Sequence, residues 1–313
     1  MPKKPIIIIS GPTASGKTAI SIEVAKHYGN FEIINCDSKQ FYKEMPIITA
    51  QPTKQERGDI PHHLFGVLSM KDSCSVTDWL DMALPIIKDV QKRGKVPLIV
   101  GGTGMYIKSL MHGLSPIPDI DPDIRRKVRE MSLSQGSQAV YEKLKELDPQ
   151  TAAKLNPGDS QRVSRAYEVI LQTGKSLSYW HSLENKMPYP EAEFLLFFVT
   201  PNRDWVYQRC NERFDQMIKQ GVIEEIAALG DEDFDNELPS VRSHGVREMK
   251  AYINGQVSLE EAIKQSQTNT RKYVKRQFTW FNNQMDEAIT INPMPGNDYK
   301  TQLFDKIDRF LLT

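Results

Sequence analysis

The sequence lacks the features expected of a secreted or membrane-spanning protein. Its only cysteines among 313 residues are Cys36, Cys74 and Cys210, and no C-x-x-C pair occurs. Isolated cysteines argue against a disulfide framework and against a cysteine-based zinc site. No apolar run approaches the roughly 18 residues that span a bilayer, and the N-terminal isoleucine run is shorter than a signal-peptide core. We therefore expect a cytoplasmic protein with no membrane partner.

Net charge is also absent, because 40 lysine and arginine residues balance 40 aspartate and glutamate residues. No overall basic field therefore indicates a nucleic-acid partner, and only a local basic patch could do so. The hydrophobic content of 39% is sufficient for a sizeable core. The length suits one large domain or two smaller ones.

The most informative stretch is a buried strand followed by a glycine loop and a helix. Four consecutive isoleucines, Ile6–Ile9, predict a strand buried on both faces. A helical pattern covers residues 19–28, and the intervening loop has the phosphate-binding pattern G-x-x-x-x-G-K-T. The loop consists of Gly11, Pro12, Thr13, Ala14, Ser15, Gly16, Lys17 and Thr18. Its backbone N–H groups and the Lys17 amine suit an anion, and the Thr18 hydroxyl can ligate Mg²⁺. The alternative, a chance glycine turn before a helix, fits this complete context poorly.

Two further predicted strands, residues 31–36 and 95–100, end in chemically useful residues. Asp37 follows the first, and Gly101-Gly102-Thr103 follows the second. Carboxyl ends of parallel strands form one ligand-binding edge, so Asp37 and Thr103 are expected near the glycine loop. Asp37 could be a general base or a Mg²⁺ ligand, or simply a turn or N-cap residue. No acidic residue ends the second strand, which disfavours ATP or GTP hydrolysis and leaves diphosphate binding possible.

A proline-rich hinge at residues 115–122 suggests a domain boundary. The pattern from 123 to 186 is helical throughout, and a strand returns at 193–199. We predict an α/β fold with a P-loop NTPase-like parallel sheet flanked by helices. Residues 1–114 and 193–313 would form this core, and 115–192 a helical insertion domain. Three further segments carry expectations of their own: a helix at 75–91 that Pro85 kinks or breaks, a helix at 202–221, and a solvated acidic loop at 231–235.

The predicted helix at 259–282 combines basic and aromatic residues. It carries Arg271, Lys272, Lys275 and Arg276, interleaved with Tyr273, Phe278, Trp280 and Phe281. Basic residues four apart repel one another, and aromatic rings can stack on unpaired bases, so the pattern suits a single-stranded nucleic acid. The pattern equally fits a helix whose aromatic face lies in the core and whose basic face lies in water.

The motifs form an ordered set that resembles the bacterial tRNA dimethylallyltransferases, also called tRNA isopentenyltransferases, of the IPP transferase family. The segments that carry the resemblance are 11–18, 37–42, 49–53, 61–64, 101–106, 161–166, 211–214 and 275–280. They extend over nearly the whole chain. A P-loop alone would be unspecific, whereas this ordered set is highly specific.

The resemblance implies a reaction. The family transfers a dimethylallyl group from dimethylallyl diphosphate to the exocyclic amine of the adenosine 3′ of the anticodon, in tRNAs that read codons beginning with U. Diphosphate is released and Mg²⁺ is required. No ATP is consumed, although the loop is often labelled a nucleotide- or ATP-binding site. The implied partner is the tRNA anticodon stem-loop, and we expect a monomer.

The resemblance also implies roles for individual residues. Asp37 would be the general base, Thr103 would fix the adenine or the donor, and Lys17 and Arg213 would hold the diphosphate, with Mg²⁺ on Thr18. The positions that match tRNA contacts are Asp37, Ser38, Lys39, Gln40, Thr103, Arg125, Gln161, Arg162, Val163, Ser164, Arg165, Arg242, Arg247, Lys275, Arg276, Gln277 and Trp280.

The chain departs from the family pattern at three places. Lys39 stands where arginine is usual, Ile48 stands where glycine is usual, and Ser243–Val246 replaces a stretch that normally holds Val-Gly-Tyr. These changes bear on tRNA selectivity and leave the diphosphate site untouched. Three other functions compete with the main one: a prenyltransferase acting on free AMP or ADP, a P-loop small-molecule kinase, and a non-catalytic RNA-binding protein. The missing acid and the basic helix count against the kinase, and the pairing of the P-loop with Asp37 and Thr103 counts against the last.

Overall fold

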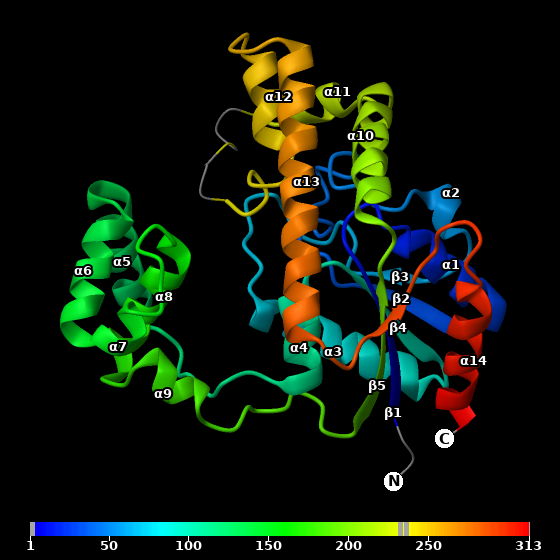
Figure 1. The fold of residues 1–313 in the computed structure, drawn as a ribbon, viewed down its shortest axis with the longest axis horizontal. Helices are drawn as coiled ribbons and strands as arrows, with labels where there is room; N and C mark the ends of the chain where they lie inside the picture. The colour runs from blue at the N-terminus through cyan, green and yellow to red at the C-terminus, as the bar shows by residue number, and fades with distance from the viewer. Residues whose placement is uncertain (1–3, 231–233, 235–237, 313) are drawn as a thin grey trace. The chain divides into compact units, whose positions relative to one another are not determined.

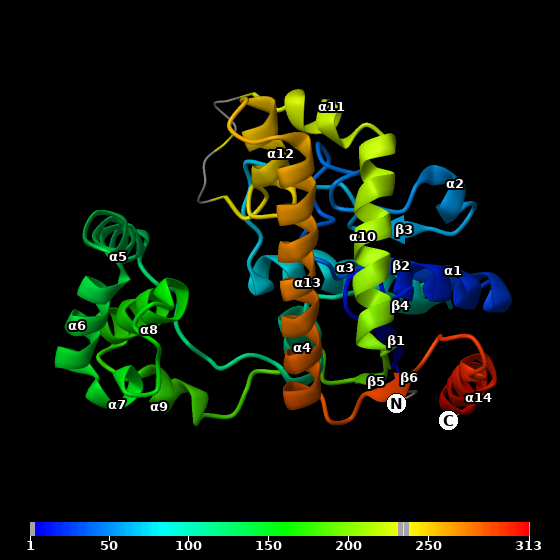
Figure 2. The same cartoon turned by 45° about the horizontal axis from the view of Figure 1, so that its top comes forward.

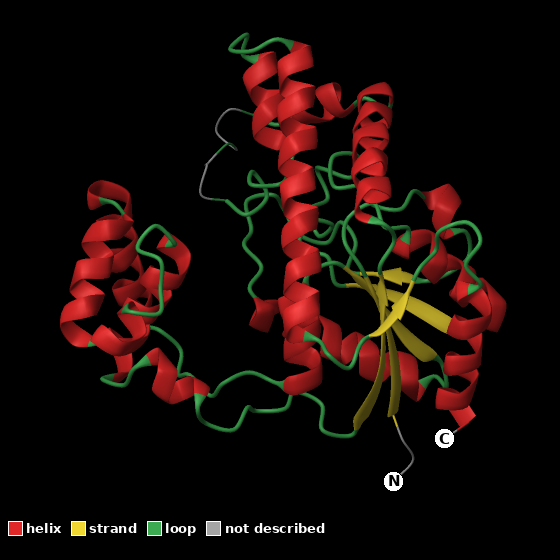
Figure 3. Cartoon of the chain, in the orientation of Figure 1, coloured by secondary structure: helices red, strands yellow, loops and turns green. Residues whose placement is uncertain are grey.

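The computed structural model describes residues 4–230, 234 and 238–312. The chain divides into two compact units, Met1–Met111 with Pro188–Thr313, and His112–Met187. The first contains the sheet and the second contains only helices and loops (Figure 3). The second unit, His112–Met187, overlaps most of the insertion that the sequence predicts at residues 115–192. The acidic loop expected at 231–235 lies outside the described residues except for Phe234.

The first unit is organised around one parallel sheet with the strand order β3-β2-β4-β1-β5-β6 (Figure 1). The strands are β1 (Lys4–Ser10), β2 (Phe31–Asn35), β3 (His62–His63), β4 (Val96–Gly101), β5 (Ala192–Val199) and β6 (Ile289–Ile291). In β1, Ile7 pairs with Leu98 of β4 and with Leu195 of β5, and the four isoleucines are fully buried. The predicted parallel α/β sheet is thus confirmed. The short edge strands β3 and β6 were not predicted.

Helices cover the sheet and extend beyond its carboxyl edge. They are α1 (Lys17–Tyr28), α2 (Lys54–Arg57), α3 (Val76–Lys92), α4 (Gly104–His112), α10 (Arg203–Lys219), α11 (Val222–Ala227), α12 (Val246–Ile253), α13 (Leu259–Gln284) and α14 (Tyr299–Leu312). Helix α13 packs beside α10 and α12 (Figure 2). Within the described part of the chain, no helix combines the length and apolarity needed to cross a membrane.

Of the two outcomes expected at Pro85, a kink or a break, the structure excludes the break, because α3 continues from Val76 to Lys92. Proline removes one backbone hydrogen bond of the helix. The loss is tolerated because α3 buries one continuous face, including Trp79, Ala83 and Ile87. The Trp79 indole also donates to the carbonyl oxygen of Asn35 at 3.0 Å, which holds the helix against the end of β2.

The second unit is a helical bundle. Its helices are α5 (Pro122–Gln135), α6 (Ser137–Leu147), α7 (Pro149–Ala152), α8 (Ser160–Thr173) and α9 (Leu177–His181). Val128, Val140, Leu144 and Ala166 form its core. The predicted helical character is correct up to His181, but residues 182–187 are not helical. There the chain instead forms a bridge in which Leu114 and Lys186 exchange backbone hydrogen bonds of 3.3 and 2.9 Å.

The buried Glu32 carboxylate connects β2 to β3 and to the segment that precedes β4. Glu32 of β2 has a side chain only 2% exposed, and it accepts hydrogen bonds of 2.8 Å from Arg93, Lys95 and His63. Hydrogen bonding to Arg93 is the main cause that holds the pKa of Glu32 far below its usual value. A carboxylate with a depressed pKa stabilises the fold above its unfolded-state pKa, and this contribution is lost as the pH falls.

We therefore expect Glu32→Gln to lower the melting temperature at pH 7 by a few degrees, with a difference from wild type that shrinks below about pH 4. Thermal unfolding followed by circular dichroism between pH 3 and pH 8 measures this. Glu56→Gln alters an exposed carboxylate and is the control for removing one charge. A Glu32→Gln deficit that stays constant across the pH range would contradict the assignment.

Candidate active site

Three loops meet at the carboxyl edge of the sheet, as predicted. The P-loop follows β1, Asp37 follows β2, and Gly101–Thr103 follows β4, and these three strands are neighbours in the order β2-β4-β1. The hydroxyl of Thr103 accepts the Ser38 N–H at 2.9 Å, which joins the second and third loops. Asp37 and Thr103 are therefore held at one end of the sheet by its topology and by a direct hydrogen bond.

The P-loop is folded into a concave nest. Ala14 and Gly16 both have left-handed backbone conformations, with φ of 62° and 93°. Such a conformation directs successive N–H groups to one side, where they attract an anion, and α1 begins at Lys17 with its positive dipole end there. Among the described residues, the buried Ser15 hydroxyl has no hydrogen-bond partner. The loop thus retains hydrogen-bonding capacity for a ligand.

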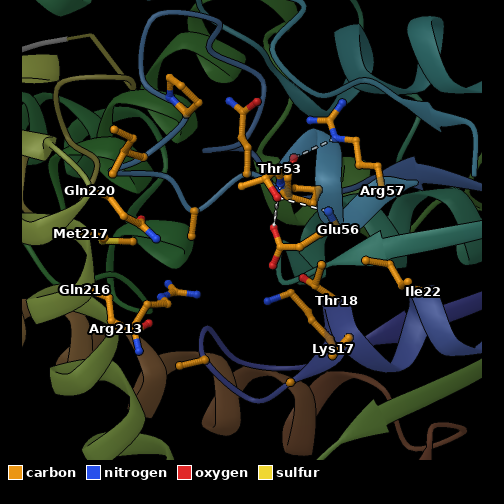
Figure 4. Close-up of a pocket in the computed structure, with 18 of the residues that line it drawn as sticks. Lys17, Thr18, Ile22, Thr53, Glu56, Arg57, Arg213, Gln216, Met217 and Gln220 are labelled. Carbon is orange, nitrogen blue, oxygen red and sulfur yellow. Dashed lines mark hydrogen bonds between the residues drawn. The ribbon is translucent and has the colours of Figure 1, made fainter. Parts of the chain in front are cut away.

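A cleft of about 1070 Å³ opens in front of the P-loop. Figure 4 shows Lys17 and Thr18 on one wall and Arg213 and Met217 of α10 on the wall that faces them. The guanidinium of Arg213 donates to the Thr13 hydroxyl at 2.6 Å, so α10 is fastened directly to the loop. The Thr18 hydroxyl makes no hydrogen bond within the described part of the chain.

Three cations in poorly solvated positions, Lys17, Lys39 and Arg213, lie near the Asp37 carboxylate. Desolvation lowers the pKa of Lys17 and of Arg213, and in both cases the nearby Asp37 charge opposes this effect. Burial likewise lowers the pKa of Lys39 to about 8, and the Lys39 amine donates to the Pro239 carbonyl at 2.6 Å. Cations that are held close together in a poorly solvated site gain most from a multiply charged anion. The cluster is therefore suited to a diphosphate.

Arg213 also lines a second, narrow pocket of about 60 Å³. Its polar lining includes Thr13, Asp37, Lys39, Ser243, His244 and Tyr273, and its apolar lining is Ile48, Cys210, Phe214 and Met217. Arg213 and Met217 also line the large cleft, so the two spaces adjoin. The pocket places the Asp37 carboxylate close to the anion cradle.

Several lining residues of the narrow pocket were not predicted. Cys210, Phe214 and Met217 recur at helical spacing beside Arg213, a pattern that could have placed them on one wall. His244 lies 4.8 Å from Tyr273 between ring centroids. Burial, reinforced by Lys39 and Arg276, lowers the pKa of His244 to about 4, so the imidazole is neutral at neutral pH.

The Gln277 side chain, at a position that the resemblance matches to a tRNA contact, is engaged within the protein. Gln277 is 5% exposed, and its amide accepts the Thr13 N–H at 2.9 Å and donates to the Gly102 carbonyl at 3.0 Å. One side chain of α13 thus connects the P-loop to the glycine loop after β4. Three residues further along α13, Trp280 lies against Gly104, where an added Cβ would approach the indole ring to 2.1 Å.

We expect Gln277→Leu to destabilise the protein by roughly 1–3 kcal/mol for each of the two backbone groups left unpaired. Urea unfolding would measure the loss. Gln265→Leu makes the same change at an exposed position of α13 and serves as the matched control. Gln277→Glu keeps the acceptor for Thr13 but sets a carboxylate oxygen against the Gly102 carbonyl oxygen in a buried position, so it should destabilise the protein at least as much as Gln277→Leu. Equal stability of Gln277→Leu and Gln265→Leu would disprove the bridging role.

The sequence allowed two interpretations of α13: a basic and aromatic surface for nucleic acid, or an aromatic face in the core with a basic face in water. The structure has features of both. Phe278 and Phe281 are buried, while Lys272, Lys275 and Arg276 are exposed. Arg271 is half-buried and donates to the Asn211 side chain at 2.6 Å. The aromatic face therefore packs in the core, and a row of three basic residues remains available to an external anion. Nearby, Arg242 and Arg247 are also exposed.

Among the other residues matched to tRNA contacts, Gln40 is partly occupied within the protein, because its amide donates to the Thr49 and Ala50 carbonyls at 3.2 and 2.7 Å. In the helical unit, Arg125, Gln161 and Arg162 are exposed, and Ser164 and Arg165 are half-buried. Val163 is 0% exposed in the core of that unit. Its side chain is therefore enclosed in that core, and a tRNA contact at this position stays a prediction.

Comparison with models of known families shows to which family the chain belongs. A family model described as IPP transferase matches residues 40–284, and one described as isopentenyl transferase matches residues 4–60. The chain belongs to the IPP transferase family. The family suggested by the ordered motifs is thereby confirmed, as is its class, the prenyl-transferring enzymes.

Individual relatives cover nearly all of the chain. The tRNA dimethylallyltransferase of Rickettsia massiliae (strain Mtu5) is 44% identical over 289 residues, which are 92% of this chain and 79% of that protein. The tRNA dimethylallyltransferase of Rickettsia typhi (strain Wilmington) is 40% identical over 313 residues, which are 100% of this chain and 98% of that protein.

Solved structures agree with the fold. The full-length tRNA isopentenylpyrophosphate transferase of Bacillus halodurans superposes with a TM-score of 0.71 at 35% identity, covering 99% of this chain and 97% of that one. A eukaryotic dimethylallyltransferase described as acting on tRNA gives a TM-score of 0.78 at 27% identity, covering 97% and 77%.

Proposed function

We propose that this protein transfers a dimethylallyl group from dimethylallyl diphosphate to the exocyclic amine of the adenosine 3′ of the anticodon, in tRNAs that read codons beginning with U. One observation carries the proposal: the narrow pocket joins an anion cradle, made by the P-loop and Arg213, to the Asp37 carboxylate. The transfer needs the anion cradle on one side of the donor carbon C1, where the diphosphate leaves. It needs the Asp37 carboxylate on the other side, where the amine attacks and loses a proton.

The site residues have complementary roles in the transfer. The amine nitrogen forms a bond to C1 of the donor while the C1–O bond breaks, and the electron pair of that bond leaves with the diphosphate. The P-loop amides, Lys17 and Arg213 stabilise the charge that develops on the leaving group. The proton of the amine passes to the Asp37 carboxylate. Thr103 fixes the loop that follows Asp37 through its bond to the Ser38 N–H.

The residues present fit a Mg²⁺ ion bound together with the diphosphate. The Thr18 hydroxyl lines the cleft and has no partner within the described chain. No group of three or more acidic, histidine or cysteine side chains there could hold a metal by itself. Mg²⁺ commonly takes few protein ligands and several from substrate phosphates and water, so Thr18 with the diphosphate is a sufficient set. The ion would neutralise charge on the departing diphosphate.

The acceptor is bound by separate parts of the chain. A base in a stem-loop must leave its stack before it can enter an enclosed site. The exposed Lys272, Lys275 and Arg276 of α13 are suited to the phosphates on either side of that base. Arg125 and Arg162 offer similar contacts on the helical unit. The protein would act on tRNA in the cytoplasm as a monomer.

Transfer of radiolabelled dimethylallyl diphosphate in the presence of Mg²⁺ tests the proposal. The acceptors are an unmodified tRNA that reads a codon beginning with U, the same tRNA with guanosine at the target position, and free AMP. We expect label in the first tRNA only. Label on AMP would instead indicate the free-nucleotide prenyltransferase. Absence of label from all three, with tight ATP binding, would favour a kinase.

A further inference from the structure

A carboxylate outside the site holds a turn that borders it. Glu225 of α11 is half-buried; one of its carboxylate oxygens accepts the backbone N–H of Ile47 at 2.7 Å, and the other accepts the N–H of Ile48 at 2.8 Å. Both donors belong to the turn at residues 46–50. Glu225 lines neither the cleft nor the narrow pocket, so any influence on the reaction must pass through this turn.

The turn at 46–50 depends on support from outside itself. Ala50 has a left-handed φ of 52°, a conformation that a residue with a Cβ keeps only where its surroundings enforce it. The Ala50 N–H donates to the Ile47 carbonyl at 2.9 Å and closes the turn. The N–H groups of Ile47 and Ile48 precede this bond, like the first donors of a helix, which find no acceptor in the helix itself. Glu225 provides an acceptor for each of them.

The same turn holds the segment that carries Asp37. The carbonyl oxygens of Thr49 and Ala50 accept the Gln40 side-chain amide at 3.2 and 2.7 Å. The backbone N–H of Gln40 donates in turn to the Asp37 carbonyl at 3.0 Å. Thr49 also lines the narrow pocket together with Asp37. A displacement of the turn would therefore be passed to the Asp37 segment through Gln40.

The anion cradle is held by different contacts. Arg213 donates to the Thr13 hydroxyl of the P-loop at 2.6 Å, and neither residue belongs to the turn. To the cleft the turn contributes only the apolar side chains of Pro46, Ile47 and Ala50. Loss of Glu225 should therefore move the base and leave the diphosphate in place.

We propose that Glu225 is a positioning residue for the transfer: through the turn at 46–50 and Gln40, it fixes the Asp37 carboxylate relative to the anion cradle. This inference rests on the proposed function, in which Asp37 is the base. A misplacement of about 1 Å, caused far from the chemistry, can lower a rate by about 10²-fold. Glu225 lines neither space of the site, so its loss affects the chemical step and not diphosphate binding.

Glu225→Ala tests the proposal by separating rate from binding. The rate of single-turnover transfer to tRNA, with saturating donor, should fall about 10- to 100-fold. The affinity for inorganic diphosphate with Mg²⁺, measured by calorimetric titration, should stay within about threefold of wild type, since the cradle is unchanged. If Glu225→Ala does not fold, Glu225→Gln decides. It has one acceptor oxygen for two N–H groups and should lower the rate at least about threefold, again with diphosphate affinity retained.

Glu224→Ala and Ile226→Ala are matched controls on the same helix. Glu224 is exposed, whereas Ile226 is fully buried in the core, so Ile226→Ala loses stability without removing an acceptor from the turn. At a temperature where every variant is folded, both controls should transfer at the wild-type rate.

Three outcomes would overturn the inference: an unchanged rate in the Glu225 variant, an equal loss of rate in Ile226→Ala, or a loss of diphosphate affinity as large as the loss of rate. Each of them leaves the proposed function intact. A wild-type protein that transfers no label to tRNA would overturn the proposed function itself.

Discussion

Replacing Asp37 with asparagine should lower kcat by on the order of 10²- to 10⁴-fold, the usual contribution of a general base. The asparagine keeps the shape of the side chain and an oxygen for the Lys39 N–H, which Asp37 accepts at 3.1 Å. It loses the ability to take a proton from the amine. Single-turnover transfer to tRNA, with saturating donor, measures the effect on the chemical step.

The interpretation of this result depends on two controls. Binding of tRNA to Asp37→Asn, measured separately, should stay within a few-fold of wild type, because the phosphate-facing basic residues are unchanged. Asp81→Asn removes an exposed carboxylate of α3 and should transfer at the wild-type rate. A loss of less than about tenfold in Asp37→Asn, with tRNA binding intact, would exclude Asp37 as the base.

Replacing Arg213 with glutamine should lower kcat/KM for the donor by about 10²- to 10³-fold, the range seen when one group that stabilises developing charge is removed. Arg213 is the cation of α10 that lines both the cleft and the narrow pocket among the described residues. Arg213→Lys restores the charge but not the planar, multiply donating group, so we expect only partial recovery. Inhibition by inorganic diphosphate should weaken in parallel with the rate.

Arg209 provides the matched control for Arg213. It lies one helical turn earlier on α10, lines the cleft, donates to the Ala14 carbonyl at 3.3 Å and stacks on Trp205 at 4.7 Å. It does not line the narrow pocket. Arg209→Gln should therefore cost less than tenfold. A larger loss for Arg209→Gln than for Arg213→Gln would place the diphosphate farther from Asp37 than proposed.

The parts of this protein that could be predicted from sequence are those encoded by neighbouring residues. A run of β-branched residues specifies a buried strand, and the spacing of Gly11, Gly16 and Lys17 specifies an anion-binding turn before a helix. The rule that parallel strands place their carboxyl ends together then positioned Asp37 and Thr103. Each step required only a local pattern and one topological rule.

The features that local patterns did not reveal involve side chains whose partners are distant in sequence. Gln277 and Lys275 look alike as polar residues of one helix, yet the first is buried against Thr13, 264 positions away, and the second is exposed. Val163 lies between residues expected at a tRNA surface but belongs to a core. Pro85 carries a local signal to end a helix, and packing on the sheet overrides it.

The sequence by itself therefore determined the family, the four longer parallel strands and the meeting of the catalytic loops at one edge of the sheet, because each depends on short-range patterns and one topological rule. Tertiary structure decided which side chains face the substrate. The narrow pocket brings together residues from near position 13 to position 273, and no local pattern encodes the helix packing that closes it. Ile48 and Phe214 of its apolar lining both lie against Gly245, where an added Cβ would approach them to 2.7 and 2.8 Å.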